Sequence, residues 1–577
     1  MLPVGSAPAV ASSRLYSSAD LPKPAKLSAL VGATVWDGTG KAAIGDAVVL
    51  IAGDRIQAVG PRSQVTVPAD ALTIDVKGKW IVPGLIDSHI HLFQSAGLYT
   101  RPDIIDLRSV WDYAEDQAAL KQSRADLFRR YLVCGITAVV DVGGPFWNFD
   151  VRQQAATMLL APRLAVAGPL ISTLARPQLD LGDPPIIQAP SPKRARELVA
   201  AQLARKPDLI KIWYIVLPDH DAAAAKAMMK ATIEAAHAGK VRVAVHATEL
   251  SAATAVVEAG ADILVHSVHD APVDDALIDL MTERGTIYIP TLAVMEGYAE
   301  VLGGEPELID IEQRYGDPTV MASWSDLAAV QSAKIAAVSA ERVKKMRARA
   351  PTMSANLKRV HEAGITVAAG TDAGNIGTLH GSSLHHELEL MVQAGMSNEA
   401  VLLSATRNAA LVFAAKPTMG TLEKDQWADL LVLDADPLAD IEALRRIHRV
   451  IKAGVMLEPD RLVDPNPASV VQQQVEAYQA RDLDRFLSYY APNVEIIKQP
   501  GGKVVAKGRE AMRPIYDKLF TSSPKLNIRI LRRTVIDGTV IDEELVTGIA
   551  KRPYVRAAAT YQVEHGLITK VELRSAE

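Results

Sequence analysis

The chain contains the segment Trp80-Ile81-Val82-Pro83-Gly84-Leu85-Ile86-Asp87-Ser88-His89-Ile90-His91, in which an apolar run ends in two histidines. An unbroken apolar run of this kind is typical of a strand that is buried on both faces. Because side chains alternate along a strand, His89 and His91 project to the same side. Such a pair is either two core histidines satisfied by hydrogen bonds or half of a divalent-metal site. Residues elsewhere in the chain favour the metal site.

Between residues 82 and about 411, strand-like segments alternate with helix-like segments, which predicts parallel βα units. The expected strands are Ile81–His91, Ile136–Val142, Arg163–Leu170, Leu209–Tyr214, Val241–His246, Ile263–His266, Thr286–Leu292 and Ile365–Thr371. Eight such units predict an α/β fold, a (β/α)8 TIM-type barrel over residues 82–411 with its active site at the C-terminal strand ends. Long loops at 92–120, 171–192 and 293–330 are expected to act as lids or binding loops.

Both flanks of this region are rich in short strands. Residues 28–81 and 412–457 contain apolar runs separated by turn residues, so we expect them to pair into one small β-sandwich beside the barrel. A linker is expected at 458–468, followed by a separate α+β domain at 469–577 whose helices come first. The strands expected in that domain are Lys525–Arg532, Thr534–Ile541, Glu544–Arg552, Val555–Glu564 and Leu567–Leu573.

Composition narrows the function classes. The 577 residues are 49% hydrophobic and 22% charged, which is typical of a globular protein. A formal net charge of −5 argues against nucleic acid as a partner. There is no run of about 18 apolar residues, so we expect no membrane span. The single cysteine, Cys134, allows no intrachain disulfide.

The first 27 residues are rich in Ala, Ser and Pro and predict a disordered tail or the remnant of a leader. Ala9-Val10-Ala11 is similar to the small-residue site that precedes signal cleavage, although no charged or apolar region comes before it. We therefore favour a periplasmic or secreted location over a cytoplasmic one, with a plain tail as the alternative.

Residues of metal-ligand type occur at five of the expected strand ends. They are His89 and His91, Lys211, His246, His266 and Asp372. In a closed barrel the first and eighth strands are neighbours, and so are the fifth and sixth, so all of these side chains converge. Each has an ordinary explanation when taken alone, such as a snorkelling lysine or a turn aspartate. Their joint placement at the same end of the barrel favours a metal site.

These motifs resemble the metal-dependent amidohydrolase superfamily over about residues 28–457. The resemblance is carried by the ligand-type residues above, by the turn Gly370-Thr371-Asp372-Ala373-Gly374, and by Trp427–Asp434, which is similar to the returning sandwich segment of that superfamily. The subgroup that the chain is most similar to is the one related to imidazolonepropionase and to bacterial Xaa-Pro dipeptidases. The lysine on the fourth strand resembles the branch with a carboxylated lysine and two metal ions.

The resemblance implies a ligand set for each metal ion. One ion takes His89, His91, Lys211 and Asp372, and the other takes Lys211, His246 and His266. N6-carboxylation turns Lys211 into an anion with one oxygen for each ion, whereas an ammonium group could not lie between two cations. A hydroxide bridging the ions attacks the scissile carbonyl, and Asp372 delivers a proton to the leaving amine. Zn²⁺ is the expected ion, and manganese, cobalt and iron remain open.

The implied function is hydrolysis of an amide (C–N) bond in a small molecule, with dipeptides or N-acyl amino acids as the expected substrates. One alternative is a mononuclear deaminase, or a cyclic-amide or lactone hydrolase, in which Glu249 shuttles protons; Glu249 also suits a helix start. Another alternative is an inactive binding or scaffold protein. Tyr214 and His380 are candidate substrate-binding residues, and the basic stretch Lys344–Arg349 is expected to be a solvated helix face.

The C-terminal region also resembles a known family. The segment Val475–Phe486 is similar to SnoaL-like members of the nuclear transport factor 2-like fold, which implies a cone-shaped α+β domain. Many such domains bind ligands or dimerise, so we expect the protein to be a homo-oligomer.

Overall fold

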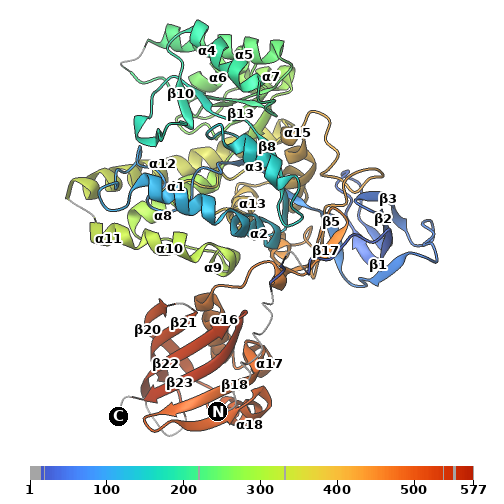
Figure 1. Ribbon diagram of the computed structural model, residues 1–577, viewed down its shortest axis with the longest axis vertical. Helices are drawn as coiled ribbons and strands as arrows, with labels where there is room; N and C mark the ends of the chain where they lie inside the picture. The colour runs from blue at the N-terminus through green and yellow to red at the C-terminus, as the bar shows by residue number, and fades with distance from the viewer. Residues whose placement is uncertain are drawn as a thin grey trace, which may run out of the picture. The chain divides into compact units, whose positions relative to one another are not determined.

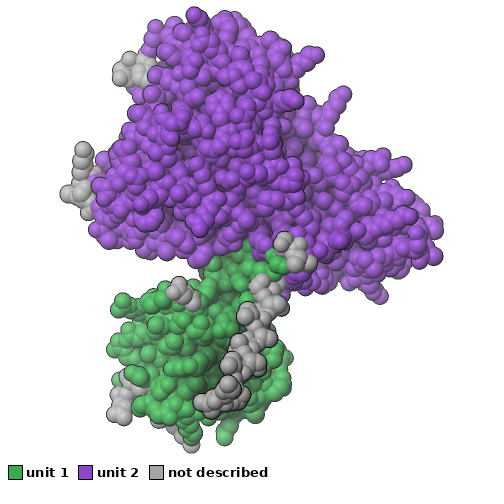
Figure 2. Space-filling model, in the orientation of Figure 1, with its two compact units in different colours: residues 1–18, 313–315, 463–577 green, residues 19–312, 316–462 purple. Residues whose placement is uncertain are grey.

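The computed structural model describes residues 15–17, 20–218, 221–330, 333–536, 538–549 and 554–575. Much of the expected tail or leader remnant at 1–27 therefore lies outside the described residues. The chain divides into two compact units, one made mainly of residues 19–462 and the other mainly of residues 463–577 (Figure 2). In the part of the chain that is described, no helix is long and apolar enough to cross a membrane.

An eight-stranded sheet joins the two flanks of the central region (Figure 1). Its strand order is β17-β16-β15-β5-β1-β2-β3, with β4 beside β1. The strands are β1 (Leu27–Val35), β2 (Ile44–Ala52), β3 (Arg55–Pro61), β4 (Leu72–Asp75), β5 (Trp80–Pro83), β15 (Leu430–Leu433), β16 (Ile447–Lys452) and β17 (Val455–Leu457). The two flanks meet where β15 runs antiparallel to β5 and pairs Leu431 with Val82.

The central region contains two sheets of parallel strands, β6-β7-β8 and β10-β9-β11-β12-β13-β14. Their bounds are β6 (Leu85–Ile90), β7 (Ile136–Asp141), β8 (Arg163–Val166), β9 (Leu170–Ser172), β10 (Ile186–Gln188), β11 (Ile210–Trp213), β12 (Val243–His246), β13 (Ile263–Val265) and β14 (Ile287–Ile289). Every residue of β6, β7 and β13 is buried, which explains why β7 and β13 are largely apolar and do not alternate. β6 also buries the polar residues Asp87, Ser88 and His89. Seven of the eight strands expected here are present.

The eighth expected strand, 365–371, is not a regular strand. Val367 makes a single parallel bridge to Tyr288, and Ala373 makes one to Ile90. The segment still lies between β14 and β6, because Tyr288 N donates to Thr366 O at 2.9 Å and Ser88 N donates to Ala369 O at 3.0 Å. The described residues thus form an α/β arrangement without a continuously hydrogen-bonded, closed barrel.

Helices cover these parallel strands (Figure 1). The α-helices before residue 463 are α1 (Tyr113–Gln122), α2 (Arg124–Val133), α3 (Asn148–Ala155), α4 (Pro192–Leu203), α5 (Ala222–Ala238), α6 (Leu250–Glu258), α7 (Asp275–Arg284), α8 (Leu292–Gly303), α9 (Asp310–Tyr315), α10 (Pro318–Trp324), α11 (Asp326–Val330), α12 (Ala333–Glu362), α13 (Ser383–Gln393), α14 (Asn398–Leu403) and α15 (Ala409–Phe413). Short turns of other helix types are η1 (Pro177–Leu179), η2 (Ser404–Asn408), η3 (Ile441–Arg445) and η4 (Pro459–Arg461). Gly285 ends α7 with a left-handed φ of 63°, as a C-cap glycine does.

The expectation of a long loop at 293–330 is wrong, because this segment is mostly helical, from α8 to α11. Its apolar residues recur at helical spacing: Val294, Tyr298, Val301 and Leu302 of α8 are buried in one cluster with Trp324 of α10. The helices therefore form a packed layer rather than an irregular lid.

The C-terminal unit has a six-stranded sheet in the order β19-β18-β23-β22-β21-β20. Its elements are α16 (Pro467–Ala480), α17 (Leu483–Ser488), β18 (Tyr490–Gln499), β19 (Lys503–Lys507), α18 (Arg509–Ser522), β20 (Asn527–Ile536), β21 (Thr539–Thr547), β22 (Tyr554–Glu564) and β23 (Leu567–Ser575). The expected boundary between the strands Lys525–Arg532 and Thr534–Ile541 is wrong, since β20 continues to Ile536. Arg533 lies inside the strand, opposite Asp542 of β21, and the two side chains form an ion pair at 2.7 Å in which Asp542 is buried.

A buried carboxylate links the eight-stranded sheet to the parallel strands. Asp429, just before β15, lies 2.6 Å from Arg163 Nε and 3.1 Å from Lys452 Nζ. Arg163 belongs to β8 and Lys452 to β16, so one carboxylate holds both sheets. Burial acts to raise the pKa of Asp429, but the two cations together hold that pKa below its usual value. The interaction is strong because all three groups are largely removed from water.

We expect Asp429→Ala to lower the free energy of unfolding by about 3–5 kcal/mol, since it leaves two cations without their buried partner. Urea denaturation followed by tryptophan fluorescence would measure the loss. The folded-state pKa of Asp429 is lowered, so this stabilisation is fully present above the unfolded-state pKa of about 4 and is lost as the pH falls through the folded-state pKa. The difference in the free energy of unfolding between wild type and variant should therefore become smaller in acid.

The matched control is Asp434→Ala. Asp434 pairs with Lys79 at 2.6 Å, but its side chain is 45% exposed, so its removal should cost no more than about 1 kcal/mol. Equal losses for the two variants would contradict a special role for the buried carboxylate.

Candidate metal centre

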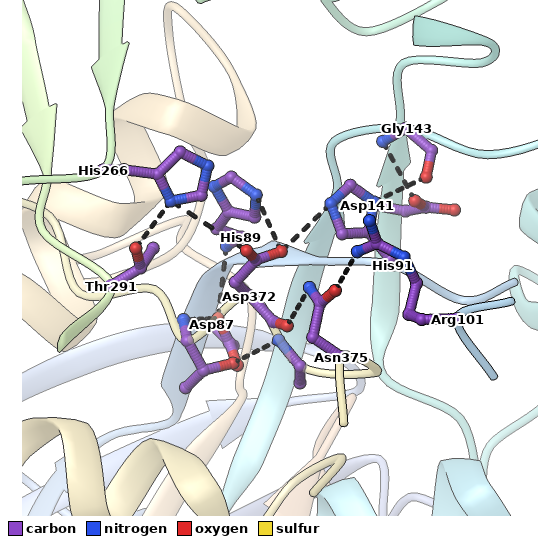
Figure 3. Close-up of polar contacts among 12 residues, drawn as sticks. Asp87, His89, His91, Arg101, Asp141, Gly143, His266, Thr291, Asp372 and Asn375 are labelled. Atoms are coloured by element: carbon purple, nitrogen blue, oxygen red, sulfur yellow. Dashed lines mark hydrogen bonds and ion pairs between the residues drawn. The ribbon is translucent and has the colours of Figure 1, made fainter. Parts of the chain in front are cut away.

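His89, His91 and Asp372 meet where β6 ends (Figure 3). Asp372 Oδ1 lies 3.4 Å from His89 Nε2 and 3.1 Å from His91 Nε2. The three side chains are buried, and one potential ligand atom from each lies within 4.8 Å of the other two. A single cation placed among these atoms could bind all three.

The two later histidines lie beside this group. The His266 ring centroid is 5.0 Å from that of His89 and 4.5 Å from that of His246. Lys211 lies on β11, whose neighbour β12 ends at His246. A cavity of about 290 Å³ is lined by five of the six predicted ligands. The ring of the sixth, His89, packs against the rings of His91 and His266. The structure thus gathers the predicted ligand set around one cavity.

Several buried polar atoms of this group lack a hydrogen-bond partner among the described residues. They are both ring nitrogens of His89, Lys211 Nζ and Asp372 Oδ1. Asp372 Oδ1 lies close to the two imidazoles, but these contacts do not have hydrogen-bond geometry. A buried polar atom left in this way costs about 1–3 kcal/mol. Such atoms concentrated around one point are well suited to bind cations, so the residues present fit a metal centre.

Burial sets the protonation states of the group. Removal from water lowers the pKa of His89 and of His246 to about 3, and that of His266 well below its usual value. The imidazoles are therefore neutral at physiological pH, as metal ligation requires. Burial also lowers the pKa of Lys211 to about 7, so a large fraction of this amine is uncharged near neutral pH.

Hydrogen bonds outside the group fix the orientation of two imidazoles. His91 Nδ1 contacts Gly143 O at 2.7 Å, which makes Nδ1 the donor and directs the lone pair of Nε2 towards Asp372. His266 Nδ1 contacts Thr291 Oγ1 at 2.7 Å. Metal-binding histidines commonly use their second nitrogen in this way.

Three residues of the site have left-handed backbone conformations without being glycine. The φ angles are 74° at His266, 48° at Thr291 and 62° at Asp372. Such conformations cost about 1–3 kcal/mol each and are concentrated at functional sites. Residue type alone does not predict these positions: Asp and His adopt the left-handed conformation more often than most residues do, but the β-branched Thr291 rarely does.

Arg101 and Asn375 also belong to the site, although neither was predicted from the sequence. Asn375 Nδ2 donates to Asp372 O at 3.0 Å, and Asn375 Oδ1 accepts from an Arg101 guanidinium nitrogen (Figure 3). The Arg101 charge is matched by Asp103, which accepts from Nε at 2.8 Å and from Nη2 at 2.9 Å. Arg101 therefore orients Asp372 through Asn375. Arg101 lies in an irregular segment, where no hydrophobic periodicity indicates which side chains point towards the site.

Tyr214, His380 and Glu249 do not line this cavity in the described structure. Both ring nitrogens of His380 are used within the fold, by Tyr131 Oη at 2.6 Å and by Gln94 O at 2.8 Å. Glu249 is exposed at the start of α6, as the helix-start explanation predicts. The structure therefore adds no support to a proton shuttle at Glu249.

Comparisons with known proteins agree with this geometry. The model of the amidohydrolase family matches residues 80–457, and the model of the SnoaL-like domain matches residues 471–571. An uncharacterized protein of Mycobacterium tuberculosis is 27% identical over 388 residues, which cover 66% of this chain and 86% of that protein.

Solved structures share the fold of the larger unit. A Xaa-Pro dipeptidase with methionine bound in its active site gives a TM-score of 0.57 at 22% identity, covering 75% of this chain and all (100%) of that one. The ochratoxinase of A. niger gives a TM-score of 0.58 at 20% identity, covering 76% of this chain and 96% of that one. At these identities the likeness concerns the fold, which is of the TIM-barrel type.

The family match includes every strand end that carries a predicted ligand, from His89 to Asp372. It supports a hydrolase that acts on carbon–nitrogen bonds, in a family that generally uses divalent metal ions. The predicted resemblance is confirmed: the chain belongs to the amidohydrolase family and carries a SnoaL-like domain.

Proposed function

We propose that the protein is a binuclear metal-dependent hydrolase that cleaves the amide bond of dipeptides or N-acyl amino acids. The observation that carries the proposal is the convergence of buried, unpartnered ligand atoms on one cavity. His89, His91, Lys211 and Asp372 would hold one ion, and Lys211, His246 and His266 the other. We further propose that eight segments act as one barrel that fixes these positions, namely β6, β7, β8, β11, β12, β13, β14 and the segment 365–373.

Lys211 is the residue that distinguishes a two-metal site from a one-metal site. Its side chain is 1% exposed, and its pKa of about 7 leaves much of the amine neutral and nucleophilic. Attack of the neutral amine on CO₂ forms an N–C bond and releases one proton, which gives a carbamate anion with two oxygens. Nearby divalent cations would stabilise that anion in an environment of low dielectric.

The two ions, zinc by the chemistry of these nitrogen and oxygen ligands, would supply activation of water and polarisation of the scissile carbonyl. Asp372 is placed to receive a proton and to pass it to the leaving amine nitrogen. Burial opposes its ionisation, but His89 and His91 hold the pKa of Asp372 well below its usual range, so it begins as a proton acceptor. Asn375 and Arg101 keep its main chain in place.

The direct test is a screen of dipeptides, N-acyl amino acids and lactones with metal-loaded protein. We expect amide hydrolysis that is abolished by a chelator and restored by Zn²⁺. Metal analysis should give two ions per chain. A single ion with ammonia release would favour a deaminase, and a metal-free, inactive protein would favour a scaffold.

We expect Lys211→Ala to lose metal together with at least about three orders of magnitude in turnover, since both ions lose a shared ligand. Lys344→Gln is the matched control, because it removes a lysine charge at an exposed position outside the cavity. Bicarbonate should speed the reconstitution of wild type but not of the variant. A Lys211→Ala enzyme with two ions and full activity would disprove the proposal.

We expect Thr291→Ala to weaken metal affinity about 10- to 100-fold, because it removes the hydroxyl that orients His266. Thr291→Ser keeps that hydroxyl and should retain the affinity of the wild type. Competition titration with a chromophoric chelator measures both variants. Equal affinities for Ala and Ser at this position would show that the contact does not tune the site.

A further inference from the structure

One face of α12 lines the metal-centre cavity. The residues that line it are Arg342, Met346, Arg349 and Met353, at the four-three-four spacing of a single helix face. The basic stretch Lys344–Arg349, which was expected to be a solvated helix face, therefore has both exposed and cavity-lining residues. Lys344, Lys345 and Arg347 are exposed, whereas Arg349 lines the cavity.

The charges that line the cavity are unbalanced. Asp372 is the one carboxylate among the lining residues, and it belongs to the proposed metal centre, as does the cation Lys211. The other three arginine or lysine side chains that line it are Arg101, Arg342 and Arg349, and in the described part of the chain only Arg101 is matched, by Asp103.

Arg342 and Arg349 have no such carboxylate partner among the residues that the structure describes. Within the described ranges, neither guanidinium lies within 4.0 Å of a carboxylate oxygen. By contrast, the exposed Arg347 pairs with Glu305 at 3.5 Å, and Lys345 pairs with Glu341 at 3.3 Å. Among the described residues of α12, the arginines without a carboxylate partner are thus those that face the cavity.

The rest of the wall is largely apolar. It includes Phe93, Ile104, Leu170, Ile186, Val294 and Met295. A ligand that fits this cavity has an apolar part for these side chains and an anionic group for the arginines. A guanidinium is suited to a carboxylate because its parallel N–H groups match the two oxygens.

We propose, resting on the hydrolase function above, that Arg342 and Arg349 bind a free carboxylate of the substrate. The preferred substrates are then amides that combine an apolar part with a carboxylate, rather than neutral amides or lactones. The two arginines act as specificity residues that raise the occupancy of the cavity, whereas bond cleavage depends on the metal centre.

The test compares each hydrolysed N-acyl amino acid with its primary carboxamide. We expect the free acid to have a kcat/KM at least about 30-fold higher. Arg342→Gln and Arg349→Gln should each raise KM for the acid about 5- to 30-fold with little change in kcat, and should leave the carboxamide unaffected. Lys344→Gln on the same helix should leave both substrates unaffected. Equal kcat/KM for acid and carboxamide in the wild type would overturn the proposal.

A binding measurement separates this proposal from the hydrolase function. Isothermal titration calorimetry measures the binding of hexanoate and of hexanamide. The proteins are the wild type and the double variant Arg342→Gln/Arg349→Gln, each with Lys211 intact and each with Lys211→Ala added. We expect hexanoate to bind in a way that depends on both arginines in both backgrounds, and hexanamide to bind weakly. If no amide is hydrolysed but this dependence is found, the carboxylate site stands and the hydrolase function fails. Hexanoate binding that is unchanged in the double variant would overturn the carboxylate site.

Discussion

The whole site depends on the hydrogen bonds between β6 and the segment after residue 366. Asp372 N donates to His89 O at 2.8 Å, and His91 N donates to Ala373 O at 2.9 Å. The buried carboxylate of Asp87 reinforces this contact by accepting from His89 N at 3.2 Å and from Thr371 Oγ1 at 2.7 Å. These bonds hold the backbone of Asp372 in its left-handed conformation, and only then does its side chain reach the two histidines.

Much of this could be predicted from residue type and position. Strand ends are predictable because apolar runs stop at polar residues, and a barrel places these ends together. His89, Lys211 and Asp372 could therefore be predicted from the sequence as neighbours in one site. The inward face of α12 could not be predicted, because a helix with arginines and lysines on several sides is oriented only by its packing on α8. The left-handed backbone of His266 is likewise set by tertiary contacts, because a histidine tolerates this conformation but does not by itself predict it.

The two units have separate hydrophobic cores, and the function of one does not define the function of the other. The C-terminal unit buries its own aromatic cluster, in which Phe486 lies 4.6 Å from Tyr516 and 5.0 Å from Tyr490 between ring centroids. Its SnoaL-like match describes a fold that serves many purposes, so its role does not follow from the match. Assembly of the protein into a homo-oligomer stays a prediction, and so does its export.

The pairing of Val82 with Leu431 has a consequence for synthesis on the ribosome. The strand that precedes the metal-binding histidines acquires its outer neighbour only after several hundred further residues have emerged. Until then, β5 presents an unpaired apolar edge, which is open to wrong partners and to aggregation. Folding of the catalytic part is therefore completed late and non-locally, whereas the C-terminal unit can follow at once from residues that emerge together.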